Sequence, residues 1–165
     1  NQLSIGDALA ISTLNQKKIS KKDFKKFHPS GNLGAKLRTV EEIMITGNKI
    51  PFVNGNLIMK KALQIISNKK LGILVVRNSK GITTGVITDG QIRRFNEVND
   101  NLQSLTVKEV MTLNPISIDK DTLVEKALSI MNSKKITSLC VHSKKNLKRT
   151  VGILHIHKIL ETNIN

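Results

Sequence analysis

The sequence contains no tryptophan, no tyrosine and only four phenylalanines among its 165 residues. A stacking platform for single-stranded nucleic acid needs several aromatic side chains, so this composition argues against one. The single cysteine, Cys140, excludes a disulfide framework and is typical of a reducing compartment, so we expect a cytoplasmic protein. No apolar run approaches the roughly 18 residues of a membrane-spanning helix, and we expect no membrane association.

Acidic residues are also scarce. The 12 Asp and Glu stand against 27 Lys and Arg, which gives a net charge of +15. The lysines are spread along the whole chain instead of forming one stripe, which does not favour a nucleic-acid-binding surface. A cationic cleft that attracts a phosphorylated metabolite is the interpretation that we prefer, with no nucleic-acid partner.

The sequence does contain an internal duplication. The segment Lys61–Val76 recurs 65 residues later at Lys126–Val141, with eight of sixteen positions identical. This period is too long for a helical solenoid and indicates a module of about 60 residues that occurs twice. Two such modules are expected to pack on each other and to leave a ligand-binding cleft at their junction.

Both copies predict the same order of elements, which makes the fold mixed α/β. The first copy predicts a helix that ends at Asn68-Lys69-Lys70, strands over Ile73–Val76 and Thr83–Thr88, and a helix from Asp89 to about Val98. The second copy predicts a helix over Leu123–Ser133, strands over Ser138–His142 and Thr150–Leu154, and a helix from about Ile156. Met44 and Met111 lie at equivalent places before the two copies and are expected to pack at their junction. Cys140 replaces Val75 and is predicted to be a core residue.

The lead-in segments Val40–Met44 and Val107–Met111, the strand-to-helix turn Gly85–Gly90 and the duplication itself resemble cystathionine-β-synthase (CBS) domains. The resemblance implies a tandem CBS pair, or Bateman module, with one domain at 40–99 and the other at 106–162. In that family the pair binds nucleotides or related metabolites and regulates an attached enzyme or channel. The implied function is therefore regulatory ligand binding.

Residues 1–38 lie outside the repeat. Gly6–Gln16 predicts an amphipathic helix. The first residue is Asn1 and not Met, and Leu3–Leu14 indicates a helix already in mid-course, so we expect the chain to be a piece of a longer protein. Gly6–Ala10, Asp23-Phe24 and Phe27–Leu37 resemble the C-terminal tail of a sugar isomerase (SIS) domain. Together with the CBS pair and the Thr88–Arg94 turn, they resemble the arabinose-5-phosphate isomerase family, in which an SIS domain precedes two CBS domains.

This second resemblance implies a parent enzyme that interconverts ribulose 5-phosphate and arabinose 5-phosphate on the route to Kdo, a lipopolysaccharide sugar. His28 matches the active-site histidine of the family and is the catalytic candidate, because a histidine near neutral pKa suits proton transfer. A loop histidine that caps a helix is the alternative. The other catalytic groups of an SIS domain are missing, so we expect the fragment alone to be inactive. The resemblance also implies a homo-oligomer: a tetramer when full length, and a dimer of CBS pairs for the fragment.

Candidate ligand-binding residues follow the second strand of the first copy. In nucleotide-binding CBS domains a Thr or Ser and helix N–H groups face phosphate, and an Asp three residues later holds the ribose diol. By this resemblance the candidates are Thr88, Asp89 and Gln91, with Gln91 at the diol position. Arg93 and Arg94 can pair with phosphate or carboxylate. Thr88 and Gln91 also match a capping box, so helix initiation alone would account for both side chains.

The second copy departs from this pattern, because Gly152–Lys158 lacks both the Thr and the Asp. His155 and His157 are the remaining candidates for ligand contacts. The end product of the family, CMP-Kdo, carries a phosphate and a carboxylate and suits a cleft with these histidines and arginines better than AMP. No acidic residue or cysteine lies close to the histidines, so we expect no metal, and we expect no cofactor. A stand-alone CBS sensor and a CBS pair that acts only as an oligomerisation scaffold remain the alternatives.

Overall fold

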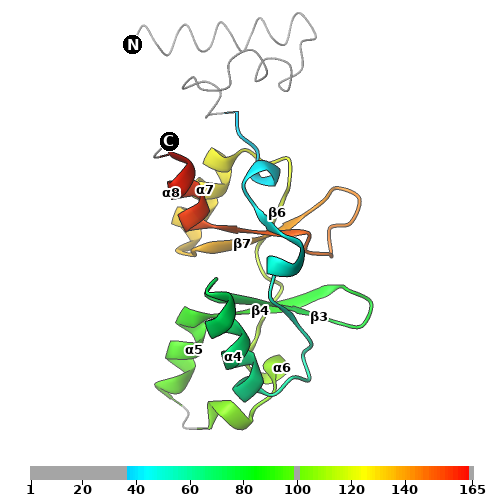
Figure 1. Ribbon diagram of the computed structural model, residues 1–165, viewed down its shortest axis with the longest axis vertical. Helices are drawn as coiled ribbons and strands as arrows, with labels where there is room; N and C mark the ends of the chain where they lie inside the picture. Colours follow the sequence, from blue (N-terminus) through cyan, green and yellow to red (C-terminus); the bar gives the residue numbers. More distant parts are fainter. Residues whose placement is uncertain (1–36, 99–100, 164–165) are drawn as a thin grey trace, which may run out of the picture.

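The computed structural model describes residues 37–98 and 101–163, which form two lobes stacked on each other (Figure 1). Each lobe is one four-stranded sheet with helices on one face. The two sheets face each other at the junction, and the helices lie on the outside of the molecule. His28 and the other predictions for residues 1–36 lie outside the described residues.

Lobe 1 has the strand order β2-β3-β4-β5, in which β2 and β3 are parallel and the other pairs are antiparallel. Its strands are β2 (Phe52–Val53), β3 (Ile73–Arg77), β4 (Thr83–Thr88) and β5 (Thr112–Leu113). Its helices are α4 (Met59–Lys69), α5 (Asp89–Asn96), the 3-10 turn η3 (Leu102–Ser104) and α6 (Val107–Val110).

Lobe 2 repeats this arrangement with the order β1-β8-β7-β6. Its strands are β1 (Ile45–Thr46), β6 (Ser117–Asp119), β7 (Ser138–His142) and β8 (Gly152–His155). Its helices are the 3-10 turn η1 (Val40–Glu42), α7 (Val124–Lys134) and α8 (Ile156–Asn163), and a second 3-10 turn, η2 (Gly47–Lys49), leads from β1 to β2. Among the described helices, none is long and apolar enough to cross a membrane.

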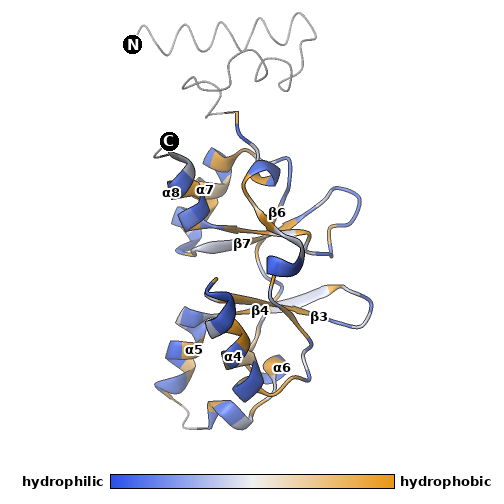
Figure 2. Ribbon diagram, viewed as in Figure 1, coloured by the Kyte–Doolittle hydropathy of each residue, from blue (hydrophilic) through white to orange (hydrophobic). Residues whose placement is uncertain are grey.

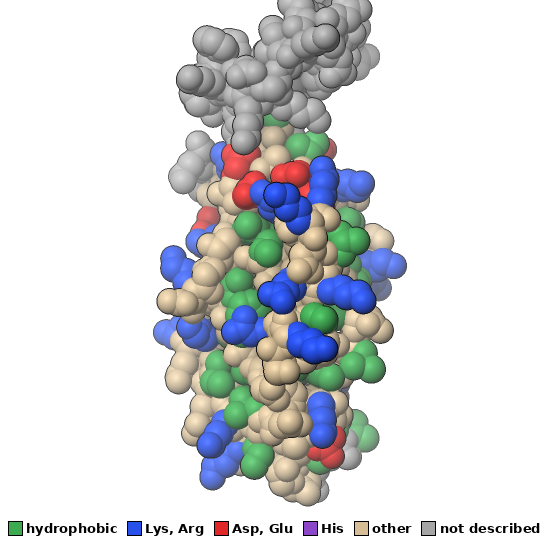
Figure 3. Space-filling model, turned by 90° about the vertical axis from the view of Figure 1, so that its right-hand side faces the viewer, with side chains coloured by type: hydrophobic (Ala, Val, Ile, Leu, Met, Phe, Trp, Pro, Cys, Tyr) green, Lys and Arg blue, Asp and Glu red, His purple; other side chains and the backbone are tan. Residues whose placement is uncertain are grey.

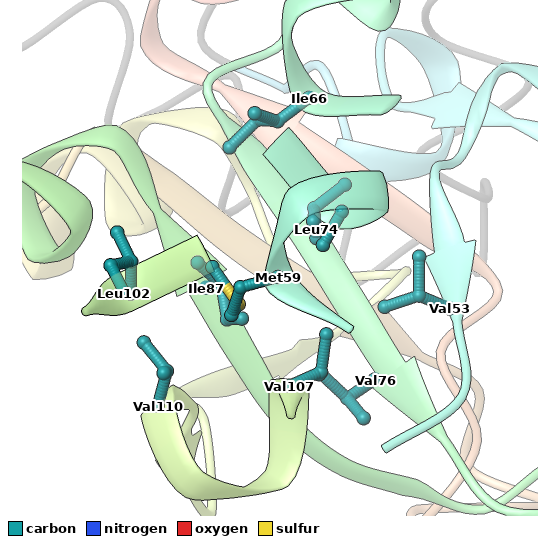
Figure 4. Close-up of a cluster of buried hydrophobic side chains, with 10 residues drawn as sticks. Val53, Met59, Ile66, Leu74, Val76, Ile87, Leu102, Val107 and Val110 are labelled. Carbon is teal, nitrogen blue, oxygen red and sulfur yellow. The ribbon is translucent and has the colours of Figure 1, made fainter. Parts of the chain in front are cut away.

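Alternating side chains of the central strands supply three apolar clusters, as the pleat of a strand buried on both faces requires. In β3, Leu74 and Val76 point into the core of lobe 1, whereas Ile73 and Val75 point toward the other sheet. Figure 4 shows Met59 of α4 in the lobe 1 core among Ile87, Leu102 and Val107. The helices carry both hydrophilic and hydrophobic residues (Figure 2), and in α4 and α7 the buried residues are apolar.

The junction between the sheets is a third apolar cluster. It is made of Ile50, Ile73, Val75, Val86, Cys140 and Ile153. Cys140 is 2% exposed, so its prediction as a core residue is confirmed. At the far end of the strands, the hydroxyl oxygens of Thr83 and Thr150 lie 2.7 Å apart, and the amide of Thr83 donates to the carbonyl of Lys148 at 2.9 Å. The lobes are therefore joined by an apolar centre and by a polar contact between their hairpin turns.

The lead-in segments are exchanged between the lobes. β1, which precedes the first copy, pairs with β8 of lobe 2, and β5, which precedes the second copy, pairs with β4 of lobe 1. Met44 and Met111 were expected to pack at the junction between the copies. Each contacts a strand of the other copy, but it packs on a lobe core and not in the cluster between the sheets. All strands of lobe 1 come from the continuous segment 52–113, and lobe 2 is built from the chain on both sides of it.

The edge of the molecule with the hairpin turns carries Lys and Arg side chains on both lobes (Figure 3). These cations are scattered among other side chains and do not form one stripe, which agrees with the even spread of lysine along the sequence. The cleft considered next lies at the opposite end of the strands, where β4 and β8 lead into helices.

Candidate functional site

Most of the sequence-predicted ligand residues meet in a cleft between the lobes, which we call the arginine cleft. It has a volume of about 630 Å³. Lobe 1 contributes the end of β4 and the start of α5, and lobe 2 contributes the start of β7 and the end of β8. Its polar wall includes Thr88, Asp89, Gln91, Arg93, Arg94, Asn114, Lys135, Thr137, Ser138 and His155, and its apolar wall includes Ile73, Val86, Ile116, Ile136 and Cys140.

Thr88 starts α5 at one side of this cleft. It has extended backbone angles, and its hydroxyl accepts a hydrogen bond from the amide of Gln91 at 3.3 Å, which is the geometry of an N-cap. Gly72, in the turn between α4 and β3, has a φ of +62° and lies against the carboxylate of Asp89. A side chain there would place its Cβ 2.9 Å from Asp89 Oδ2, so glycine is what lets this carboxylate stay at the cleft wall.

Gln91 does not complete the predicted capping box. Its side-chain amide donates to the carbonyl of Val110, the last residue of α6, instead of reaching back to Thr88. The prediction that Thr88 caps α5 is confirmed. The prediction that the Gln91 side chain bonds back to Thr88 is wrong, because the carbonyl of Val110 at the end of α6 lacks an intrahelical partner and accepts from Gln91 instead. The side-chain amide of Gln91, which is at the predicted diol position, thus already forms a hydrogen bond within the protein.

Three cations face the cleft. Arg93 and Arg94 of α5 are exposed, and the guanidinium of Arg94 lies 3.5 Å from the place where a Cβ of Gly90 would be. Lys135 lies on the opposite wall, at the C-terminal end of α7, in a left-handed conformation with φ +54°. Asp89 is the one acidic residue among the described residues of the wall, so the cleft favours an anionic ligand.

The apolar wall offers a surface for a flat or aliphatic group. Ile116 is 40% exposed, although most large apolar residues of the described chain are buried. Burial raises the pKa of Cys140 to about 11, so its thiol is neutral at physiological pH and behaves as part of this apolar surface.

His155 occupies the place in lobe 2 that Thr88 has in lobe 1, directly before a helix. Its Nδ1 accepts a hydrogen bond from the amide of His157 at 3.1 Å, and the two rings stack with centroids 4.9 Å apart. Burial, and then the neighbouring His157, lower the pKa of His155. The ring is therefore neutral near pH 7, with its proton on Nε2 and available for donation.

The structure brings six of the seven predicted ligand residues to one cleft, and it leaves His157 exposed and outside the wall. The sequence prediction missed Lys135, Thr137, Ser138 and Ile116, which come from the second copy and its connection to the first. The repeated Lys-Lys pair at the end of each long helix could have indicated Lys135. Within the described ranges, no group of three or more His, Cys, Asp or Glu could hold a metal ion.

This arrangement suits binding of an anionic metabolite with an apolar part. The cations can hold a phosphate or carboxylate near the positive end of the α5 dipole, and the neutral His155 can donate a hydrogen bond. The apolar wall can contact a base or sugar face.

Comparison with known proteins agrees with the fold. The profile of the CBS domain matches residues 40–97 and 107–164. The CBS domain pair of protein MJ0100, in complex with 5′-methylthioadenosine and S-adenosyl-L-methionine, superposes with a TM-score of 0.68 at 22% identity over 77% of this chain and 96% of that one.

Two curated bacterial relatives are more similar in sequence. Arabinose 5-phosphate isomerase KdsD of Salmonella typhi is 36% identical over 98% of this chain and 49% of the isomerase. Arabinose 5-phosphate isomerase KpsF of Escherichia coli is 35% identical over 93% of this chain and 46% of the isomerase. The chain thus spans about half the length of these relatives.

Proposed function

Because this chain belongs to the CBS domain family, we propose that it is the regulatory CBS-pair region of an arabinose 5-phosphate isomerase and that its arginine cleft binds a nucleotide or CMP-Kdo. The isomerase activity belongs to the half of the parent enzyme that the chain lacks. This chain contributes His28 to that active site. The chain alone is then inactive, and turnover of ribulose 5-phosphate by the purified 165-residue protein would contradict this.

The observation that carries the proposal is the grouping of three cations around an apolar wall. Arg93, Arg94 and Lys135 come from both lobes and face one space. A nucleotide presents the matching groups, a phosphate and a flat base, and the CBS pair of MJ0100 holds two adenosine compounds. A cationic cleft also raises the local concentration of anionic ligands.

The number of cations in the cleft favours CMP-Kdo over AMP. The diol position holds Gln91, whose amide is bonded to Val110, so neither AMP nor the cytidine of CMP-Kdo gains the charge-assisted contact that a carboxylate makes with ribose. CMP-Kdo carries a carboxylate besides its phosphate, and two arginines and a lysine provide cations for both anions. Binding of CMP-Kdo would let the end product of the pathway regulate the isomerase by feedback.

Isothermal titration calorimetry with AMP, CMP and CMP-Kdo tests the ligand. CMP-Kdo should bind the most tightly, and Arg94→Glu should weaken its binding at least tenfold by placing a like charge beside the anion. Lys126→Glu, which makes the same charge change on the exposed surface of α7, should change affinity less than twofold. Tighter binding of AMP, or equal losses in both variants, would contradict the assignment.

The scaffold function is the alternative, and the engagement of Gln91 with Val110 favours it. A thermal-shift screen separates the two, since a ligand that binds only the folded chain raises its melting temperature by mass action. A shift with any nucleotide supports a sensor. No shift with AMP, ATP, CMP or CMP-Kdo would favour a CBS pair that acts only in assembly.

A further inference from the structure

The repeat creates a second cleft, which corresponds to the arginine cleft but has different side chains. Gly85 and Gly152 occupy equivalent places, each against the lead-in methionine of its sheet, and the eight-residue helices α5 and α8 follow at the same distance. Counting from these glycines, Lys158 takes the place of Gln91 and Glu161 takes the place of Arg94. Both residues line the second cleft, as Gln91 and Arg94 line the first.

This second cleft, which we call the lysine cleft, has a volume of about 770 Å³, so space does not distinguish it from the first. Its wall is formed by the first lead-in, the C-terminal end of α4 with the turn that follows it, and one face of α8. The lining residues include Glu42, Ile43, Met44, Lys49, Lys69, Leu71, Lys158 and Glu161.

The cations of the lysine cleft are largely engaged by the protein itself. Lys158 Nζ lies 2.8 Å from Glu161 Oε2, and this hydrogen bond, more than the charge alone, lowers the pKa of Glu161. Lys69 Nζ donates to the carbonyl of Asn48 at 2.7 Å. At the start of α8 the amide of His157 is bonded to His155, as the amide of Gln91 is bonded to Thr88 in α5, so the two clefts differ in their side chains and not in these amides. An anion would have to displace these contacts and would then lie beside the carboxylate of Glu161.

The cations of the arginine cleft are not paired in this way. In the described part of the chain, Arg93, Arg94 and Lys135 form no salt bridge with a carboxylate. The position equivalent to Arg93 is Leu160, so two cations of α5 are replaced by an apolar and an acidic residue in α8. The two clefts, which are similar in size, thus differ in their acidic residues and in how far their cations are paired.

We propose that each chain binds one anionic ligand, in the arginine cleft, and that Glu161 excludes an anion from the lysine cleft. This inference rests on the proposed function, because it assigns the ligand to one of the two clefts that a CBS pair offers. The two lobes have the same backbone arrangement, but the pairing of Lys158 with Glu161 leaves only one of the two clefts able to bind an anion.

Calorimetry with CMP-Kdo and AMP measures the stoichiometry. The wild-type chain should bind one ligand per chain, and the double variant Lys158→Gln/Glu161→Arg, which installs the residues found at positions 91 and 94, should bind two. Urea unfolding of the variant checks that it is folded. Two ligands per wild-type chain, or one ligand in the folded double variant, would overturn the proposal.

A second measurement keeps this test separate from the proposed function. If no nucleotide binds, the proposed function fails, yet inorganic pyrophosphate can still report which cleft accepts an anion. In an NMR titration, amides of 88–94 and 135–138 should shift and those of 158–162 should not. Shifts in both clefts, or in neither, would overturn the asymmetry.

Discussion

At the scale of single residues, Gly85 and Gly152 allow the exchanged lead-ins to lie against the sheets. A Cβ on Gly85 would come within 2.7 Å of both Met111 Sδ and the carbonyl oxygen of Thr112, and a Cβ on Gly152 would meet the sulfur of Met44. The thioether can move, but the backbone carbonyl of β5 cannot move without weakening its pairing with β4.

Gly85→Ala should therefore lower the free energy of unfolding by about 1–3 kcal/mol, as overpacking of a close contact does. Gly90→Ala is the matched control, because its nearest neighbour is the flexible end of Arg94 at 3.5 Å and alanine favours a helix. Urea unfolding measures both. Equal stability of the two variants would mean that the lead-in moves away at no cost.

His155 gives a residue-scale prediction about pH. Its pKa is lowered in the folded chain, so the stability that it contributes is present above the unfolded pKa of about 6.5 and is lost as pH falls through the folded pKa. Protonation at Nδ1 would also remove the acceptor that caps α8. His155→Asn keeps a cap without a titrating ring, and it should reduce the loss of stability between pH 7.5 and pH 5.

The measurement is urea unfolding at both pH values for the wild type, His155→Asn and the control His157→Asn. The control removes an exposed histidine and leaves the cap in place, so it should keep most of the pH dependence. The same pH dependence in His155→Asn as in the wild type would rule out His155 as its source.

At the scale of elements, the first lead-in is fixed to lobe 2 over its whole described length. The amide of Val40 donates to the carbonyl of Thr122 at 2.8 Å, and the amide of Val124 donates to the carbonyl of Arg38 at 2.9 Å. Lys120 and Glu41 form a salt bridge at 2.6 Å on the surface. The first described residues of the chain thus belong to lobe 2, and lobe 1 follows them in the sequence.

Val40 and Val107 are equivalent in the repeat and both are 0% exposed, but they belong to the cores of lobe 2 and lobe 1, respectively. Truncating either to alanine should cost about 2 kcal/mol. Amide hydrogen exchange should then become faster in β7 and β8 for Val40→Ala, and in β3 and β4 for Val107→Ala. Faster exchange confined to the repeat that carries the substitution would contradict the exchange of lead-ins.

At the scale of the whole molecule, the sequence predicts the parts that are long and periodic. The strands Thr83–Thr88 and Ser138–His142 match β4 and β7, and the long helices end within a residue or two of their predicted ends, because each has an apolar pattern of its own. The strands of two or three residues were missed, since so few residues carry no period. Their partners lie far away in sequence: Ile45 pairs with Ile153.

The candidate site divides in the same way. Thr88 through Arg94 were predicted because they form one local motif, whereas Lys135 and Ile116 enter the cleft only through the stacking of the lobes. The hydrogen bond from Gln91 to Val110 joins two helices that the sequence shows as separate. Local patterns thus indicated half of the cleft, and the tertiary fold supplied the rest.

The exchanged lead-ins also bear on how such a duplicated gene can change. A duplicated segment can ordinarily be lost again, since the remaining copy keeps everything that it needs. Here, deletion of either repeat with its lead-in would take away β1 or β5 and leave the surviving sheet with an unpaired edge at β8 or β4. A free edge invites pairing with another chain, so the copies have become mutually dependent. A deletion that removes residues 52–113 takes away all four strands of lobe 1 and leaves the sheet of lobe 2 complete.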